Sequence, residues 1–296
     1  MPNWAYNKIT AKTDEDFNVL CKKFLDKNEN LDFNTVVPMP DTIKNTTGVS
    51  KTEHMGMIAY ILTHKPDGSI LTLNTKDDVI NAIDVHNQGD GQLAEDLTDD
   101  DFRTIIKSSK RQDDLEWNKQ QWDRFPDFNE GRNYFTEAEN ALHNVLHYGV
   151  TNWYDWSINN WGSKWNASNT YVDEMERSIY WETAWSPTVE IAQNMSKICA
   201  DPVYYQYAEE QFTEYVGEFI FHKGDVIEQS ENPGGLEQYL LAAELIDPEQ
   251  DETRYDPKSR QTIFAWDMEP EKMERLDAKC PAIYQDTDIK REFINI

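Results

Sequence analysis

Six of the chain's ten tryptophans lie in two short stretches near its middle. Residues 153–167 read WYDWSINNWGSKWNA, and residues 180–187 read YWETAWSP. One indole buries about 150–250 Å² and needs a partner for its N–H, so indoles this dense predict a folded core. The alternative, a platform on which bases or sugars stack, needs exposed aromatics beside cations, and only Lys164 and Arg177 lie nearby in sequence. We expect the structural core to contain Trp4, Trp153, Trp156, Trp161, Trp165, Trp181 and Trp185.

The same region predicts a helix, a sharp turn, a strand and a second helix. A helix that begins at Asn152 or Trp153 would end at Gly162, which adopts the left-handed conformation at little cost. Residues 178–185 are rich in aromatic and β-branched residues and predict a strand. Ser186 and Pro187 then predict the N-cap and the first turn of the next helix.

The charge of the chain limits its partners. Its 296 residues carry a net charge of −27, from 55 acidic and 28 basic side chains. Such a charge repels phosphate backbones and anionic lipid surfaces, and it attracts basic surfaces. Aromatic residues make up 12% of the chain, which is too many for a disordered acidic segment. We therefore expect a folded protein that binds a basic partner and contacts neither nucleic acid nor membrane directly.

The cysteines and the N-terminus bear on location. Cys21, Cys199 and Cys280 are widely separated, which argues against a disulfide framework and for a reducing compartment. No basic segment followed by an apolar one begins the chain, and no run of about eighteen apolar residues occurs. We expect a cytoplasmic protein.

The first forty residues predict a strand, a helix and a second strand. Residues 4–11 alternate apolar and polar side chains. Thr13 with Asp16 forms a variant of the capping box before a helix with one apolar face. Residues 31–37 then predict a second strand, which the prolines that follow would end.

Residues 41–134 predict a mostly helical insertion. We expect helices at residues 55–62, 77–85 and 93–97, and another directly after Thr98. The aspartates at 99–101 would complement the positive end of that last helix, and they lack the spacing and glycine of a calcium loop.

Two features resemble catalytic or metal sites. A helix opened by Thr136 and ended by Gly149 carries His143 and His147 one turn apart, a spacing that can hold a metal. The glutamate that a zinc hydrolase uses as its base is missing, so we expect a partly buried, hydrogen-bonded pair. Glu182 lies in a strand between two tryptophans, but strand alternation turns it away from its neighbour Trp181 and toward solvent.

No glycine-rich nucleotide loop, cysteine-pair motif or nucleophile elbow occurs in the sequence. The sequence therefore predicts no catalytic residue, no cofactor and no metal site. In the last third of the chain, residues 203–207, 215–221 and 226–228 predict an antiparallel meander. A helix at 236–245, a short strand at 262–266 and a helix at 270–279 follow.

Four blocks in the right order resemble the YubB-type ferredoxin-like family of phage- and plasmid-borne proteins. They are residues 1–4 (MPNW), 33–40 (FNTVVPMP), 153–166 and 182–187 (ETAWSP). The resemblance implies an α+β fold with a ferredoxin-like split β-α-β core at residues 1–40 and 135–230. A helical insertion at 41–134 and a C-terminal arm or subdomain at 231–296 lie outside it. The family offers no catalytic residues to carry over.

The resemblance also implies an origin in a mobile element. Phages carry accessory proteins that bind and disable host defences, and DNA-handling complexes present basic grooves. Our hypothesis is a non-enzymatic, homo-oligomeric counter-defence inhibitor of a host DNA-processing complex, with the Gabija nuclease complex as the candidate target. It would block DNA binding or cleavage. The candidate contact residues in the insertion are Asp99, Asp100, Asp101, Asp113, Asp114, Trp117 and Trp122.

Two alternatives stay open. The first is an enzyme acting on a nucleotide or nucleic acid, with the tryptophan-rich stretches as its pocket and His143, His147 or Glu182 as acid or base. The second is an acidic mimic of DNA, in which carboxylates lie in rows like phosphates. Binding by such a mimic weakens steeply with salt.

Overall fold

The computed structural model describes residues 3–65, 67–87, 97–126, 131–212, 215–246, 253–256 and 259–264. Contacts divide the chain into two compact units. Met1–Val37 and Trp161–Ile296 form what we call the sheet unit, and Pro38–Asn160 form the helical unit. Residues 135–160, which the sequence placed in the ferredoxin-like core, therefore belong to the helical unit. The reason is that the apolar face of the helix in this segment packs on other helices of the insertion.

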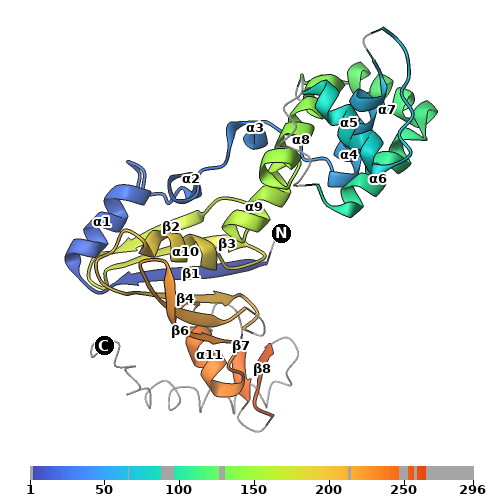
Figure 1. Ribbon diagram of the computed structural model, residues 1–296. Helices are drawn as coiled ribbons and strands as arrows, with labels where there is room; N and C mark the ends of the chain where they lie inside the picture. Colours follow the sequence, from blue (N-terminus) through green and yellow to red (C-terminus); the bar gives the residue numbers. More distant parts are fainter. Residues whose placement is uncertain are drawn as a thin grey trace. The chain divides into compact units, whose positions relative to one another are not determined.

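The sheet unit is built on a six-stranded antiparallel sheet with the order β2-β3-β1-β4-β5-β6 (Figure 1). The strands are β1 (Trp4–Ala11), β2 (Ser168–Asp173), β3 (Ser178–Ala184), β4 (Val203–Glu209), β5 (Gly217–His222) and β6 (Asp225–Glu231). Helix α1 (Asp14–Phe24) follows β1, and α10 (Val189–Ser196) joins β3 to β4. The succession β1-α1-β2-β3-α10-β4, with β1 between β3 and β4, is that of a ferredoxin-like domain. The predicted α+β, ferredoxin-like fold class is confirmed.

The predicted strand at residues 31–37 is wrong. This segment forms a short helix, α2 (Phe33–Val36), and its N-cap Asp32 accepts a hydrogen bond from the backbone N–H of Asn34. The backbone N–H of Phe33 donates to Oδ1 of Asn166 at 2.8 Å. The Asn166 side chain thus takes the hydrogen bond that a neighbouring strand would otherwise accept from this backbone. The strand that pairs with β3 is β2. Strand β2 was not predicted, because its residues do not alternate between buried apolar and exposed polar side chains.

Asn7 joins three strands and a helix on one face of the sheet. Its side chain is 1% exposed on β1. Nδ2 donates to Oγ1 of Thr183 on β3 at 3.0 Å, and Oδ1 accepts from the Tyr205 hydroxyl on β4 at 2.7 Å. Oδ1 also accepts from the backbone N–H of Thr188 at 3.1 Å, just before α10. Complete burial raises the pKa of Tyr205 well above its ordinary value, so its hydroxyl keeps the proton that it donates.

The opposite face of β4 is covered by α11 (Gly235–Ala243). Ala208 packs in one apolar cluster with Tyr239 and Ala242 of this helix, and Nε2 of Gln206 donates to Glu244 at 2.7 Å. Residues 235–243, which the sequence assigned to a C-terminal arm, are therefore part of the sheet unit. Strands β7 (Thr253–Asp256) and β8 (Gln261–Phe264) form a separate two-stranded sheet. The helix predicted at residues 270–279 lies outside the described residues.

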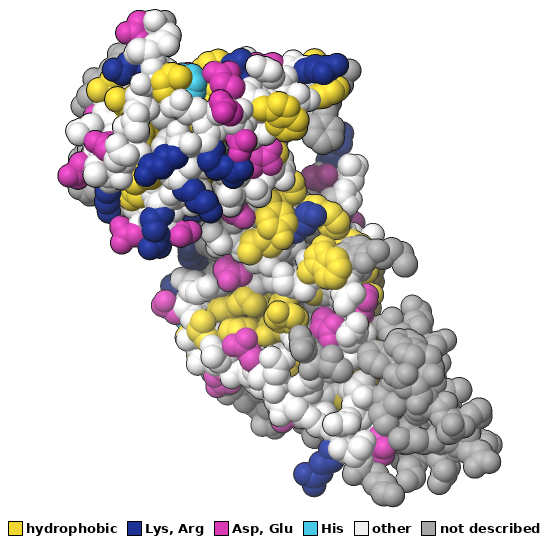
Figure 2. Space-filling model, turned by 90° about the vertical axis from the view of Figure 1, so that its right-hand side faces the viewer, with side chains coloured by type: hydrophobic (Ala, Val, Ile, Leu, Met, Phe, Trp, Pro, Cys, Tyr) yellow, Lys and Arg dark blue, Asp and Glu magenta, His cyan; other side chains and the backbone are white. Residues whose placement is uncertain are grey.

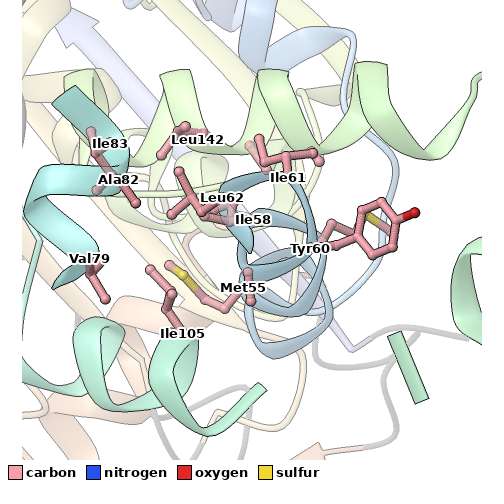
Figure 3. Packing of buried hydrophobic residues seen from close by; sticks show 14 of the residues in the cluster. Met55, Ile58, Tyr60, Ile61, Leu62, Val79, Ala82, Ile83, Ile105 and Leu142 are labelled. Carbon is pink, nitrogen blue, oxygen red and sulfur yellow. The ribbon is translucent and has the colours of Figure 1, made fainter. Parts of the chain in front are cut away.

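The helical unit packs around α4 (Lys51–Thr63), whose side chains are buried on nearly every side (Figure 3). A helix that is apolar all round becomes the centre of a core. Ile58 and Leu62 pack with Ile83, Ile105 and Leu142. The helices are α3 (Asp41–Lys44), α4 (Lys51–Thr63), α5 (Lys76–His86), α6 (Asp99–Ser109), α7 (Gln112–Arg124), α8 (Tyr134–Tyr148) and α9 (Trp153–Trp161), which runs to the unit boundary.

Helix α7 was not predicted from the sequence. The helix predicted at residues 93–97 lies almost wholly outside the described residues. Two predicted N-caps are wrong. Helix α8 is capped by Asn133, whose side chain accepts from the N–H of Thr136, and α10 begins after Thr188 and not at Ser186. The predicted left-handed end at Gly149 is confirmed, with φ at 70°. Among the described helices, none is long and apolar enough to span a membrane.

Replacing Gly162 with alanine should destabilise the sheet unit. Gly162 has φ at +77°, and a Cβ there would lie 2.7 Å from the Glu190 carboxylate and 3.1 Å from the Pro187 carbonyl oxygen. We expect Gly162→Ala to lower the free energy of unfolding by about 2–3 kcal/mol, measured by urea denaturation. Gly149→Ala is the matched control, because its φ is +70° and nothing lies within 4 Å. That change should cost only about 1 kcal/mol of backbone strain. Equal losses for the two variants would contradict the proposed close contact.

Candidate functional site

The helical unit has an open groove of about 650 Å³ between the start of α4, the end of α6 and one face of α7. Its floor is apolar, with Leu115 and Trp122, and its rim carries Glu53 and the ion pair of Arg111 with Asp114. A groove with an apolar floor and a charged rim is typical of a surface that receives a side chain of another molecule. The lining residues are Val49, Ser50, Thr52, Glu53, Gly56, Ser108, Arg111, Asp114, Leu115, Asn118, Gln121, Trp122, Phe125 and Tyr134.

The predicted contact residues of α7 are divided between two sides of the helix. Asp114 and Trp122 line the groove, where Trp122 is only 8% exposed and so belongs to the floor. Asp113 and Trp117 lie outside the groove, and Trp117 is 60% exposed. Three further lining residues, Asn118, Gln121 and Phe125, were not predicted, although with Asp114 they repeat at the spacing of one helix face.

The acidic triplet at the start of α6 is mainly a helix cap. Thr98 and Asp101 form a complete capping box, and Asp101 is buried against Lys51, whose Nζ lies 2.8 Å away. Burial favours a higher pKa for Asp101, but the hydrogen bonds from Lys51 and Thr98 outweigh it and lower the pKa. The prediction that Asp101 contacts a partner is therefore wrong, because its carboxylate is buried against Lys51. Asp99 and Asp100 are exposed and form ion pairs with Lys76 and Arg103.

A buried ionisable cluster in the helical unit was not predicted. Glu137 on α8 and His54 on α4 are both fully buried, with Oε1 and Nε2 2.9 Å apart. Oε1 of Glu137 also accepts from the backbone and hydroxyl of Thr47 at 2.7 Å, and Oε2 lies 3.6 Å from Nη1 of Arg132. His54 and Glu137 are 83 residues apart, so no sequence spacing could have indicated the pair. Its closed surroundings favour a role in holding α4, α8 and the loop before α4 together.

Neutralising Glu137 should remove pH-dependent stability from the helical unit. Burial favours a higher pKa, but hydrogen bonds from His54 and Thr47 lower the pKa of Glu137 below its ordinary value. The carboxylate therefore stabilises the fold fully above about pH 4.3, the pKa of an unfolded glutamate, and this stability is lost as the pH falls through the folded-state pKa.

We expect Glu137→Gln to cost about 3 kcal/mol at pH 7, because it removes one partner of a buried charged pair. The difference from the unchanged protein should shrink in acid, as measured by urea denaturation at a series of pH values. Glu139→Gln, on the exposed side of the same helix, is the control and should change stability by less than about 0.5 kcal/mol. A Glu137→Gln penalty that is independent of pH would contradict this account.

The tryptophans of the two central stretches do not form one core. Trp156, Trp161 and Trp181 are buried, as predicted, and Trp4 and Trp153 are half-buried. Nε1 of Trp161 donates to the Val37 carbonyl oxygen at 2.9 Å, and Nε1 of Trp181 donates to Oγ1 of Thr188 at 2.9 Å. The prediction is wrong for Trp165 and Trp185, which are 43% and 54% exposed. Trp165 follows the left-handed Gly162, and Trp185 is itself the left-handed residue directly after β3.

Trp185 combines exposure with an unfavourable backbone. Its φ is +73°, a left-handed conformation that costs a bulky residue about 1–3 kcal/mol. The backbone is held there because the N–H of Trp185 donates to the Asn3 carbonyl oxygen at 2.8 Å. Strained residues often lie at functional sites, where the surrounding fold enforces the conformation.

Two substitutions at position 185 distinguish the effect of backbone strain on stability from the effect of removing the indole ring. Trp185→Ala and Trp185→Gly both remove the ring, but only glycine accepts the left-handed conformation without cost. We expect the glycine variant to be more stable than the alanine variant by about 1 kcal/mol, measured by thermal and urea denaturation. An alanine variant as stable as the glycine variant would show that the residue is not strained in solution.

The other candidate acids and bases are dispersed. His143 and His147 lie on α8 with their ring centroids 4.1 Å apart, and both are exposed, so the expected partial burial is wrong. Loss of some hydration to neighbouring side chains, together with the nearby His147, lowers the pKa of His143 below its ordinary value. Glu182 lies in the sheet unit on the partly exposed side of β3, as predicted, and accepts from Asn169 at 2.7 Å. Within the described ranges, no three His, Cys, Asp or Glu side chains are grouped to hold a metal.

Residues 160–254 match the family model of the ferredoxin-like domain in Api92-like protein. The match spans β2 to β6 with α10 and α11, and it leaves β1 and α1 outside. It agrees with the ferredoxin-like order of the sheet. No curated protein and no solved structure matches the chain significantly.

Proposed function

We propose that the protein is a phage-encoded, non-enzymatic counter-defence inhibitor that works by binding a host DNA-processing complex. The Gabija nuclease complex is the candidate target, and loss of its DNA binding or cleavage is the proposed effect. The proposal has three supports: the resemblance to a family of phage- and plasmid-borne proteins, the net charge of −27, and the exposed indoles described below.

The exposure of three tryptophans carries the proposal. Trp117 in the helical unit and Trp165 and Trp185 in the sheet unit are each at least 43% exposed. An indole left in water forgoes a large burial free energy, and tryptophan is among the residues that most often dominate protein–protein binding. Exposed indoles in a strongly acidic chain favour a partner surface that is apolar at its centre and basic around it.

The distribution of charge favours protein contacts over mimicry of DNA. A mimic needs carboxylates in continuous rows. On the face shown in Figure 2, lysine and arginine side chains gather on the helical unit, and hydrophobic patches reach the surface between the carboxylates. The candidate acids Asp99 and Asp100 are likewise paired with cations. We infer that charge steers the encounter and that aromatic contacts hold the complex.

The test mixes the purified protein with the purified Gabija complex. We expect the two to co-elute from a sizing column and DNA cleavage to fall at least about tenfold at saturation. Trp117→Ala should weaken binding by about 2 kcal/mol, because this exposed indole is one of the proposed aromatic contacts. Light scattering of the protein alone measures the predicted homo-oligomer. If the two proteins do not co-elute and DNA binding by the complex is unchanged, the proposed target is wrong. If binding is lost steeply as salt is added, the result favours the DNA mimic.

A further inference from the structure

Two exposed indoles of the sheet unit lie on loops that are bonded to each other. Oγ of Ser163 donates to the Ala184 carbonyl oxygen at 3.3 Å, and Oγ of Ser186 donates to the Gly162 carbonyl oxygen. These bonds join residues 162–166, which carry Trp165, to residues 184–187, which carry Trp185. The two exposed indoles are therefore carried by adjacent loops, which together we call the Trp165–Trp185 surface.

One indole of this surface already binds a cation. Nζ of Lys164 lies 4.7 Å from the centroid of the Trp165 ring, within the range of a cation–π contact. Trp185 is more exposed, and in the described part of the chain no ring or ammonium group stacks on it. Its ring is therefore available to a cation from another molecule.

The surroundings add negative charge. The Glu190 carboxylate lies beside Gly162, so close that a Cβ there would be 2.7 Å from its oxygen. Glu190 is exposed, and the chain as a whole carries −27. The carboxylate thus lies beside the loop at residues 162–166, which is bonded to the loop that carries Trp185. A planar guanidinium group suits an acidic aromatic surface of this kind, because it can stack on a ring and donate hydrogen bonds from its edge. The compact ammonium group of lysine cannot do both.

We infer that the Trp165–Trp185 surface binds an arginine side chain of a partner protein, with the guanidinium stacked on Trp185. This inference rests on the proposed function, because a basic DNA-binding surface is rich in arginine. It explains why a strained, exposed tryptophan stands where glycine would fit better: the indole makes the contact, and the left-handed backbone turns it outward.

The test measures binding of two labelled peptides by fluorescence anisotropy at physiological ionic strength. One peptide alternates serine and arginine, and the other alternates serine and lysine, so both carry the same charge. We expect the unchanged protein to bind the arginine peptide more tightly. Trp185→Ala and Trp185→Gly should each weaken binding of the arginine peptide about fivefold and weaken binding of the lysine peptide by a smaller factor. Both variants lack the indole, but only the alanine variant keeps the backbone strain. Equal losses of affinity in the two variants would therefore assign the effect to the indole.

Two further variants control the result. Tyr171→Ala removes an exposed ring of β2 in the same unit and should not change either affinity. Lys164→Ala should free the Trp165 ring. The affinity for the arginine peptide should then rise by a larger factor than the affinity for the lysine peptide. Circular dichroism verifies that each variant is folded.

Equal affinities of the unchanged protein and both Trp185 variants for the arginine peptide would overturn the inference. Equal affinities of the unchanged protein for the arginine and lysine peptides would overturn it as well. The assay contains no defence protein, so its failure is distinct from a failure of the protein to bind the Gabija complex.

Discussion

The buried side-chain amide of Asn7 holds the sheet unit together at the point where three strands and a helix meet. Its Nδ2 bonds to β3, and its Oδ1 accepts from β4 and from the backbone before α10. A buried polar group without partners costs about 1–3 kcal/mol, so this network tolerates little change in the register of β1. With that register fixed, Trp181 points inward to Thr188, and the chain must turn outward one residue after β3 ends.

This constraint explains the division of the tryptophans. Trp181 and Trp161 have backbone or hydroxyl acceptors for their N–H groups and fill the interior. Trp165 and Trp185 lie on the loops at residues 162–166 and 184–187, and both are exposed in the part of the chain that the structure describes. The same sequence blocks thus serve two purposes. Part of each block builds the ferredoxin-like domain, and part of it is exposed on the surface of that domain.

The helical unit has a different organisation. Its centre is an apolar helix, α4, and a buried His54–Glu137 pair ties that helix to α8. Removing one member of such a pair is costly, whereas the pair as a whole adds little net stability. The unit is held together without the sheet, and its groove over Trp122 is open to solvent.

The sequence by itself determined much of the local structure. Capping residues such as Thr13 and Thr98, the left-handed glycines and the apolar spacing of β1, β3, α1 and α4 follow from interactions within a few residues, and they were predicted. The α+β class followed from the same patterns, together with the family resemblance. Residues 31–37 were misread because a β-branched run predicts a strand unless something else satisfies its backbone. Here Asp32 and Asn166 do so, and Asn166 is more than 130 residues away.

Only the tertiary structure decided which tryptophans are buried, which aspartates are accessible and where the units divide. Indole spacing is the same for a core residue and a surface residue, and Trp161 and Trp165 differ only in what folds over them. Asp101 and Asp100 are neighbours in one cap, yet Lys51 buries the first and leaves the second in solvent. These outcomes depend on contacts between segments far apart in the chain, and no periodicity within a single segment encodes them.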